Sequence, residues 1–174
     1  MPAPDQPAPD QPAPDQPAPD RVRTHLSTRS KARKRALDIL FEADLRGEDP
    51  ISTLDVRADL ADPPVRDYTA DLVRGVVRHG GEVDRRIAAC MSGGWSLERM
   101  PRVDRAAARI AVYEIDHSDT PDEVAIAEAV ALVGDLSTEE SPAYLNGLLG
   151  AVLTTKQPDQ GDDVAAVSSV ADPG

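Results

Sequence analysis

Apolar residues recur at spacings of three and four along most of residues 27–153, the pattern that places side chains on one face of an α-helix. The first such segment predicts a helix from near Thr28 to Arg46, with Gly47 beyond its end. The same spacing predicts six further helices, over about residues 51–60, 65–79, 83–91, 102–114, 121–131 and 141–152. No segment shows the alternation typical of a strand. The pattern therefore predicts an all-α fold of about seven helices.

Two short polar segments mark the starts of the last two predicted helices. Residues 120–123, Thr-Pro-Asp-Glu, have the spacing of a capping box, in which the hydroxyl of Thr120 would accept a backbone hydrogen bond. Residues 137–140, Ser-Thr-Glu-Glu, offer a second capping box. Ser141-Pro142 offers another start one turn later, so the sequence leaves the first residue of the last helix open.

Both ends of the chain lack an apolar face that could be buried. Residues 2–20 repeat Pro-Ala-Pro-Asp-Gln, in which frequent proline removes amide donors and prevents a helix. Residues 154–174 are acidic and rich in small side chains. We therefore expect disordered tails over residues 1–26 and 154–174. Residues 27–153 then form one folded domain, which is long enough to bury a hydrophobic core.

The composition and the scarcity of reactive groups narrow the class of protein. A single cysteine, Cys90, excludes an internal disulfide, and we expect a core position for it. No apolar stretch reaches the roughly 18 residues of a membrane span, and no secretory signal is visible. His25, His79 and His117 lie singly, without the spacing of metal ligands. We expect a soluble cytoplasmic protein with no membrane contact, enzymatic activity, metal site or cofactor.

Positive charge is concentrated in one segment of an acidic chain. The net charge is −12, yet residues 21–35 carry seven lysines and arginines and no acidic residue. Basic side chains at the start of a helix oppose its macrodipole, whereas a phosphate partner would reverse that cost. A solvated charge run is the alternative interpretation. The pattern is compatible with single-stranded RNA held through its phosphates, with a base stacked on Tyr68 or on an arginine.

An ordered set of motifs resembles the NusB family of transcription antitermination factors. The resemblance covers about residues 27–153, and the set is specific although no single motif is decisive. The matching segments are Arg29–Arg33, Ala36–Phe41, Leu72–Val76, Trp95–Pro101, Val103–Ile115, Val124–Val130 and Tyr144–Leu149.

The resemblance implies two packed three-helix-like halves and no enzymatic activity. It also implies binding of the boxA RNA of rRNA leaders together with the ribosomal protein NusE, within an antitermination complex on RNA polymerase. The expected RNA-contacting residues are the basic start of the first helix, an aromatic residue on the third helix, and an acidic residue near the last helix. In this sequence they are Arg29, Ser30, Lys31, Arg33, Lys34, Tyr68 and Glu140.

The sequence leaves two interpretations open for Tyr68 and more than one for the function. The helical spacing of Tyr68 indicates the core, whereas its position in the family indicates RNA. Trp95 is expected to be a packing anchor between the halves, and Arg109 and Glu114 are expected to form ion pairs. Alternative functions are a protein-interaction module whose acidic body binds a basic ribosomal protein, and an rRNA-modification accessory domain. A homodimer that hides the RNA face also stays open.

Overall fold

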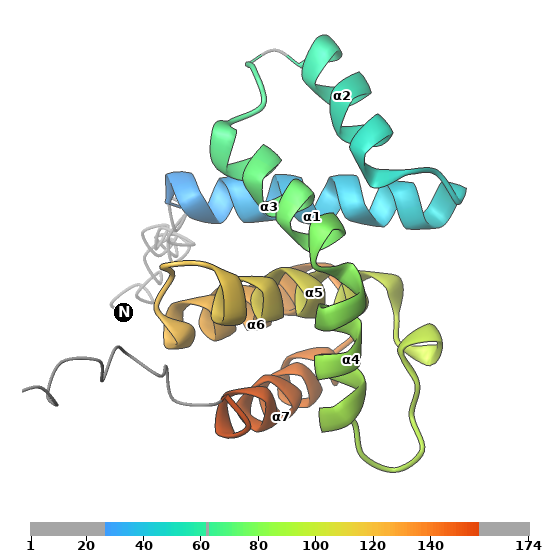
Figure 1. Cartoon of the computed structure of the whole chain (residues 1–174), viewed down its shortest axis with the longest axis vertical. Helices are drawn as coiled ribbons and strands as arrows, with labels where there is room; N and C mark the ends of the chain where they lie inside the picture. The colour runs from blue at the N-terminus through green and yellow to red at the C-terminus, as the bar shows by residue number, and fades with distance from the viewer. Residues whose placement is uncertain (1–26, 62, 157–174) are drawn as a thin grey trace, which may run out of the picture.

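The computed structural model describes residues 27–61 and 63–156, and within them every regular element is helical. Figure 1 shows the helices in chain order. They are α1 (Thr28–Arg46), α2 (Pro50–Leu60), α3 (Asp67–Arg78), α4 (Gly80–Cys90), a 3₁₀ turn η1 (Leu97–Arg99), α5 (Arg102–His117), α6 (Asp122–Leu136) and α7 (Ser141–Thr154). The all-α prediction is confirmed. None of these helices is long and apolar enough to cross a membrane.

α5 lies at the centre and packs against helices of both halves (Figure 1). α1, α2 and α3 pack on one another and form the first half, while α4, α6 and α7 surround α5 and complete the second. Ala107, Ala108 and Ala111 of α5 are fully buried. Their short side chains let neighbouring helices approach α5 closely on several sides. The two-halved arrangement is therefore organised by one alanine-rich helix.

The ends of α1 follow directly from local sequence chemistry. At its start, the Ser27 hydroxyl accepts a hydrogen bond from the backbone N–H of Ser30 at 3.0 Å, as an N-cap residue does. At its end, Gly47 has a φ of 67°, the left-handed conformation that favours glycine. The predicted bounds of this helix, Thr28–Arg46, are confirmed.

Gly75 permits a close approach between α3 and α5. A Cβ atom at this position would lie 2.0 Å from Cζ of Tyr113, far inside a van der Waals contact. The Tyr113 ring therefore lies against the backbone of α3 at a point where no side chain fits. This approach places the end of α3 beside the end of α5, where the groove described below is formed.

The predicted capping of the last two helices is partly wrong. Thr120 does not cap α6, because its hydroxyl donates to the Glu114 carboxylate at 3.1 Å. α7 begins at Ser141, the later of the two predicted starts, and the Ser141 hydroxyl donates to Asp104 at 2.7 Å. In both cases a hydroxyl that could cap its own helix binds a carboxylate on α5 instead.

The described chain extends slightly beyond the predicted folded region. α7 ends at Thr154, and Lys156 pairs with Asp122 at the start of α6, with 2.9 Å between Nζ and Oδ1. The predicted tail 1–26 lies outside the described residues, as does all of the predicted tail 154–174 beyond residue 156.

Trp95 is at the surface, so the expectation of a packing anchor between the halves is wrong. Its side chain is 56% exposed. The ring centroid lies 6.2 Å from that of Tyr144, and the guanidinium carbon of Arg99 lies 5.9 Å from the indole. Gly93 and Gly94, both with positive φ, turn the chain just before it. The turn leaves the indole at the rim of the second half.

Candidate nucleic-acid interface

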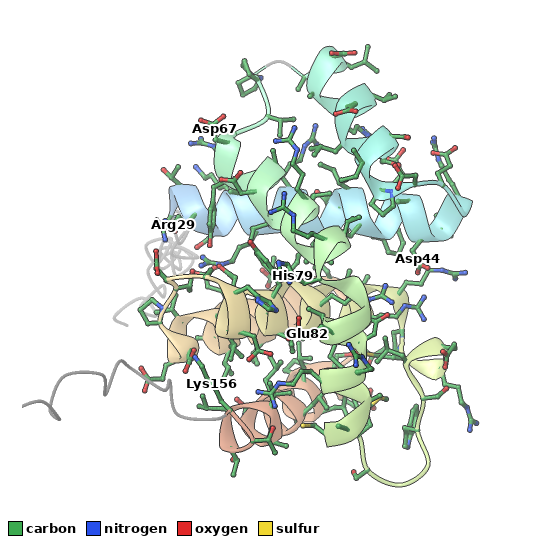
Figure 2. All side chains as sticks on the ribbon, in the orientation of Figure 1. Arg29, Asp44, Asp67, His79, Glu82 and Lys156 are labelled. Atoms are coloured by element: carbon green, nitrogen blue, oxygen red, sulfur yellow. The ribbon has the colours of Figure 1, made fainter. Side chains whose placement is uncertain are left out.

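The basic start of α1 divides between solvent and core. Arg29 and Lys31 are exposed, as Figure 2 shows for Arg29 at the end of the helix. Ser30 and Arg33 are buried, with Arg33 only 2% exposed. Lys34 is intermediate and pairs with Asp38 one turn later, at 3.3 Å. The basic residues at the start of α1 therefore lie in three environments: exposed, half-buried and buried.

Arg33 forms a buried ion pair with Glu114 of α5. Its Nε donates to Oε2 at 2.9 Å, and its Nη2 donates to Oε1 at 2.8 Å, the two-pronged geometry that matches a carboxylate. Glu114 is completely buried. Burial lowers the pKa of Arg33, but the hydrogen bond and charge of Glu114 outweigh it and raise that pKa. The guanidinium therefore stays charged inside the protein.

The burial of Arg33 argues against the expectation that it contacts RNA. A phosphate cannot reach this guanidinium in the observed structure, because the side chain is enclosed and occupied by Glu114. The expectation that Glu114 forms an ion pair is confirmed, as is that for Arg109, whose Nε donates to Asp84 at 2.7 Å. Arg33 instead holds the side chains of Glu114 and Tyr68 in place through hydrogen bonds.

Tyr68 links this buried pair to the surface. Its hydroxyl accepts a hydrogen bond from Nη2 of Arg33 at 3.2 Å and donates to the Glu114 carboxylate. Burial and the bond to Glu114 raise the pKa of the phenol, so it remains a donor. The guanidinium carbon of Arg29 lies 4.9 Å from the centre of the ring, within the range of a cation–π contact. Tyr68 thus has its hydroxyl in the core and an exposed arginine over its ring.

Glu128 of α6 is the second acidic residue near the start of α1. The Ser30 hydroxyl donates to its Oε1 at 2.7 Å, and Nη1 of Arg33 lies 3.6 Å from its Oε2. These contacts offset the negative charge of Glu128 beside the exposed arginine and lysine. Ser30, one of the predicted RNA contacts, is therefore engaged within the protein.

A surface groove continues from Arg29 along α3 toward the end of α5. It has a volume of about 430 Å³, and its lining includes Tyr68, Arg74, Arg78 and Tyr113. Arg74 and Arg78 are exposed and four residues apart on α3, so they lie on the same face of the helix. Asp71 and Asp119 also line it. The groove combines three arginines with two tyrosine rings.

The four exposed cations in the first turn of α1 and on α3 have no counterion among the described residues. No acidic oxygen of residues 27–61 and 63–156 lies within 4.0 Å of their charged nitrogens. They are Arg29, Lys31, Arg74 and Arg78. Sequence reasoning missed the two arginines of α3, although their spacing of four residues was a usable signal. Unpaired exposed arginine and lysine are the groups that bind phosphate oxygens.

Glu140 lies apart from the other predicted site residues. It is exposed and immediately precedes α7. Lys156, just after α7, pairs with Asp122 at the start of α6, which shows that α6 and α7 run antiparallel. The start of α7 therefore lies beyond the far end of α6, whereas Ser30 contacts α6 at Glu128. None of the described polar contacts joins Glu140 to α1 or α3.

His79 and His117 are brought together, which contradicts the expectation that the histidines lie singly. Their rings are stacked with centroids 3.8 Å apart, and both line the far end of the groove. They are 38 positions apart in the chain, so no local spacing could have indicated the contact.

Comparisons with known proteins agree with the resemblance seen in the sequence. A family model described as the NusB family matches residues 30–154. The transcription antitermination protein NusB of Nocardioides sp. is 52% identical over 132 residues, covering 75% of this chain and 97% of that protein. The NusB of Cutibacterium acnes is 53% identical over 144 residues, covering 81% of this chain and 55% of that longer protein.

Solved structures show the same fold. T. maritima NusB is 28% identical, with a TM-score of 0.68 over 76% of this chain and 94% of that chain. A chain from a crystal structure of the antitermination factors NusB and NusE in complex with dsRNA is also 28% identical, with a TM-score of 0.66 over 74% of this chain and 97% of that chain. On the family match, the relatives and the fold together, the chain belongs to the NusB family.

Proposed function

We propose that this protein is a non-enzymatic transcription antitermination factor that binds boxA RNA of rRNA leaders together with the ribosomal protein NusE. In this role it would support rRNA synthesis in the cytoplasm as part of an antitermination complex on RNA polymerase. The observation that carries the proposal is the groove between α1, α3 and the end of α5, with its uncompensated cations and aromatic rings. The names of the relatives and the similar structure containing NusB, NusE and RNA support it.

The RNA backbone would follow the exposed cations from the start of α1 along α3. Arg29 and Lys31 supply charge at the helix start, and Arg74 and Arg78 extend it over one turn of α3. Single-stranded nucleic acids are bound by such cationic grooves with aromatic platforms. Neutralising about four phosphates gives a log–log salt slope near −3, or about fiftyfold weaker binding between 50 and 200 mM salt.

Tyr68 would present a stacking surface whose orientation is fixed from inside. Its hydroxyl is held by Arg33 and Glu114, so the ring cannot turn without losing two polar contacts. Arg29 rests over the ring at 4.9 Å, and a base could stack on this pair or replace the guanidinium when Arg29 moves to a phosphate. Arg33 then serves RNA binding by positioning Tyr68.

The acidic body of the protein supports the proposed binding of NusE. A chain with a net charge of −12 offers a favourable surface to a basic ribosomal protein such as NusE. The same charge favours the alternative that the protein acts only as a protein-interaction module. A homodimer that covers the groove would weaken RNA binding, and NusE would have to displace it.

Direct titration of a boxA-containing RNA, with and without NusE, tests the proposal. Charge reversal at two exposed sites, Arg29→Glu with Lys31→Glu, should weaken binding at 50 mM salt by at least a hundredfold, because two attractions become repulsions. Arg85→Glu is the matched control, since Arg85 is exposed on α4 and does not line the groove.

Two results would contradict the RNA-binding proposal. In one, the double variant binds boxA RNA as tightly as the unchanged chain. In the other, the unchanged chain binds NusE but never RNA, which favours the interaction module. The mass of the free protein, measured in the same buffer, decides between a monomer and a homodimer.

A further inference from the structure

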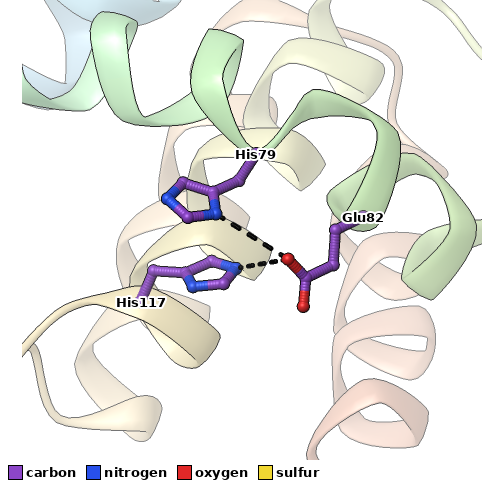
Figure 3. A group of neighbouring side chains, drawn as sticks. All are labelled: His79, Glu82 and His117. Atoms are coloured by element: carbon purple, nitrogen blue, oxygen red, sulfur yellow. Dashed lines mark ion pairs between the residues drawn. The ribbon is translucent and has the colours of Figure 1, made fainter.

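Three side chains from two separate parts of the chain converge where α3, α4 and α5 meet (Figure 3). His79 lies at the junction of α3 and α4, Glu82 is in the first turn of α4, and His117 is the last residue of α5. Nδ1 of His79 lies 3.7 Å from Oε2 of Glu82, and Nε2 of His117 lies 3.6 Å from the same oxygen. The three ligand atoms all lie within 4.8 Å of one another.

These distances are too long for hydrogen bonds, so the contacts leave one polar atom without a partner. Nε2 of His117 is buried and has no hydrogen-bond partner among the described residues. A buried polar atom without a partner costs about 1–3 kcal/mol. The neighbouring carboxylate faces the same space and is 56% exposed. The site therefore has an unsatisfied nitrogen, an anionic oxygen and an open side toward solvent.

The two distances from the Glu82 oxygen suit one shared metal ion, and the two imidazole nitrogens, which lie within 4.8 Å of each other, must be no more than about 4.2 Å apart to share it. Zinc binds imidazole nitrogen at about 2.0–2.1 Å and carboxylate oxygen at about 2.0–2.2 Å. Two such ligands 3.6–3.7 Å apart subtend roughly 120–130° at the ion, and closing the gap by about 0.3 Å gives a tetrahedral angle. The imidazole planes are stacked 25° from parallel, so both rings must turn toward the ion. The torsion between Cβ and the ring is a soft one.

We propose that His79, Glu82 and His117 form a binding site for a divalent transition-metal ion such as Zn²⁺, with water in the remaining position. Two imidazoles and one carboxylate are a ligand set that zinc uses when one position stays open. The ion joins the end of α3, the start of α4 and the end of α5, and so stabilises the junction between the two halves. This inference is independent of the proposed RNA binding.

The chain without an affinity tag, freed of metal with a chelator, is the material for the test. Titration with Zn²⁺ by calorimetry, and with Co²⁺ by visible absorption, should show one ion per chain and a tetrahedral-type Co²⁺ spectrum. The melting temperature should rise with added Zn²⁺, because an ion that binds only the folded state stabilises it.

Three single variants probe the ligands: His79→Gln, Glu82→Gln and His117→Gln. Each should weaken Zn²⁺ binding by at least tenfold, since loss of an outer-shell partner already costs about 10–100-fold. His25→Gln is the matched control, because it removes the third histidine of the chain, and it should bind as the unchanged protein does.

The proposal is overturned if the unchanged chain binds no Zn²⁺ at millimolar concentration. It is also overturned if His117→Gln or Glu82→Gln binds Zn²⁺ with unchanged affinity, which would place the ion on other groups such as Cys90. Melting curves without metal show whether each variant is folded. Glu82 is largely exposed, so its replacement keeps the test decisive even where a histidine variant fails to fold.

Discussion

Arg33 is buried in an ion pair, whereas Arg29 is exposed. Replacing each residue should therefore affect stability and RNA binding differently. Arg33→Met removes a guanidinium that is 2% exposed and leaves the fully buried carboxylate of Glu114 without its counterion. Breaking a buried ion pair from one side costs about 3–5 kcal/mol. A domain of this size unfolds with roughly 5–15 kcal/mol, so the loss is a large fraction of the total. At ~3–4 °C per kcal/mol, the melting temperature should fall by about 10–20 °C.

Urea unfolding followed by circular dichroism measures the free energy, and the salt dependence of RNA binding measures phosphate contacts. Arg33→Met should lower the free energy of unfolding while the salt slope stays the same, because Arg33 contacts no phosphate. Arg29→Met should do the reverse. Its stability should change by less than about 1 kcal/mol, the value of an exposed cation–π contact, while the slope becomes shallower by about 0.7. The two variants remove the same type of charge from one helix, four residues apart.

A double variant separates the missing guanidinium from the stranded carboxylate. Arg33→Met combined with Glu114→Leu removes both charges and should recover most of the lost stability, since apolar replacement of a whole buried pair is often neutral. The reasoning is refuted if Arg33→Met melts like the unchanged protein and also has a shallower salt slope. That pair of results would mean that Arg33 leaves the core and binds the RNA.

Two further predictions concern residues around the groove. Tyr68→Phe should cost about 1.5–3 kcal/mol at pH 7. Because the pKa of this phenol is raised in the folded state, its contribution is full below pH 10.0 and is lost as pH rises through the folded-state pKa, so the two proteins should converge in stability in alkaline urea titrations. Gly75→Ala should destabilise the protein strongly, because the added Cβ displaces the Tyr113 ring. Gly147→Ala on α7 should instead stabilise it by up to about 1 kcal/mol, because the added Cβ meets nothing within 4 Å. Thermal melts of both variants test this contrast.

The helices could be predicted from the sequence because their signals are local. The apolar spacing of α1 lies within one segment, and Gly47 marks its end by a conformation that its own backbone requires. Family motifs added the expectation of two halves and an RNA-binding start of α1. Neither signal depends on which helices meet in space.

Sequence patterns do not reveal where a side chain binds a group on another helix rather than one in its own segment. Arg33 looked like an RNA contact because its counterion, Glu114, is 81 residues away in the sequence. Thr120 had the right spacing for a cap, but its hydroxyl binds the same carboxylate. His79 and His117 seemed isolated because only the packing of α3 against α5 brings them together.

The most direct test of the central claim is the affinity for boxA RNA, in the presence of NusE, as a function of salt concentration. The exposed cations at the start of α1 and on α3 predict tight binding at 50 mM salt. They also predict a log–log slope near −3, which Arg74→Met with Arg78→Met should reduce by about 1.4. No measurable binding at 50 mM salt, or a slope unchanged in that double variant, would contradict the claim that this groove holds the RNA.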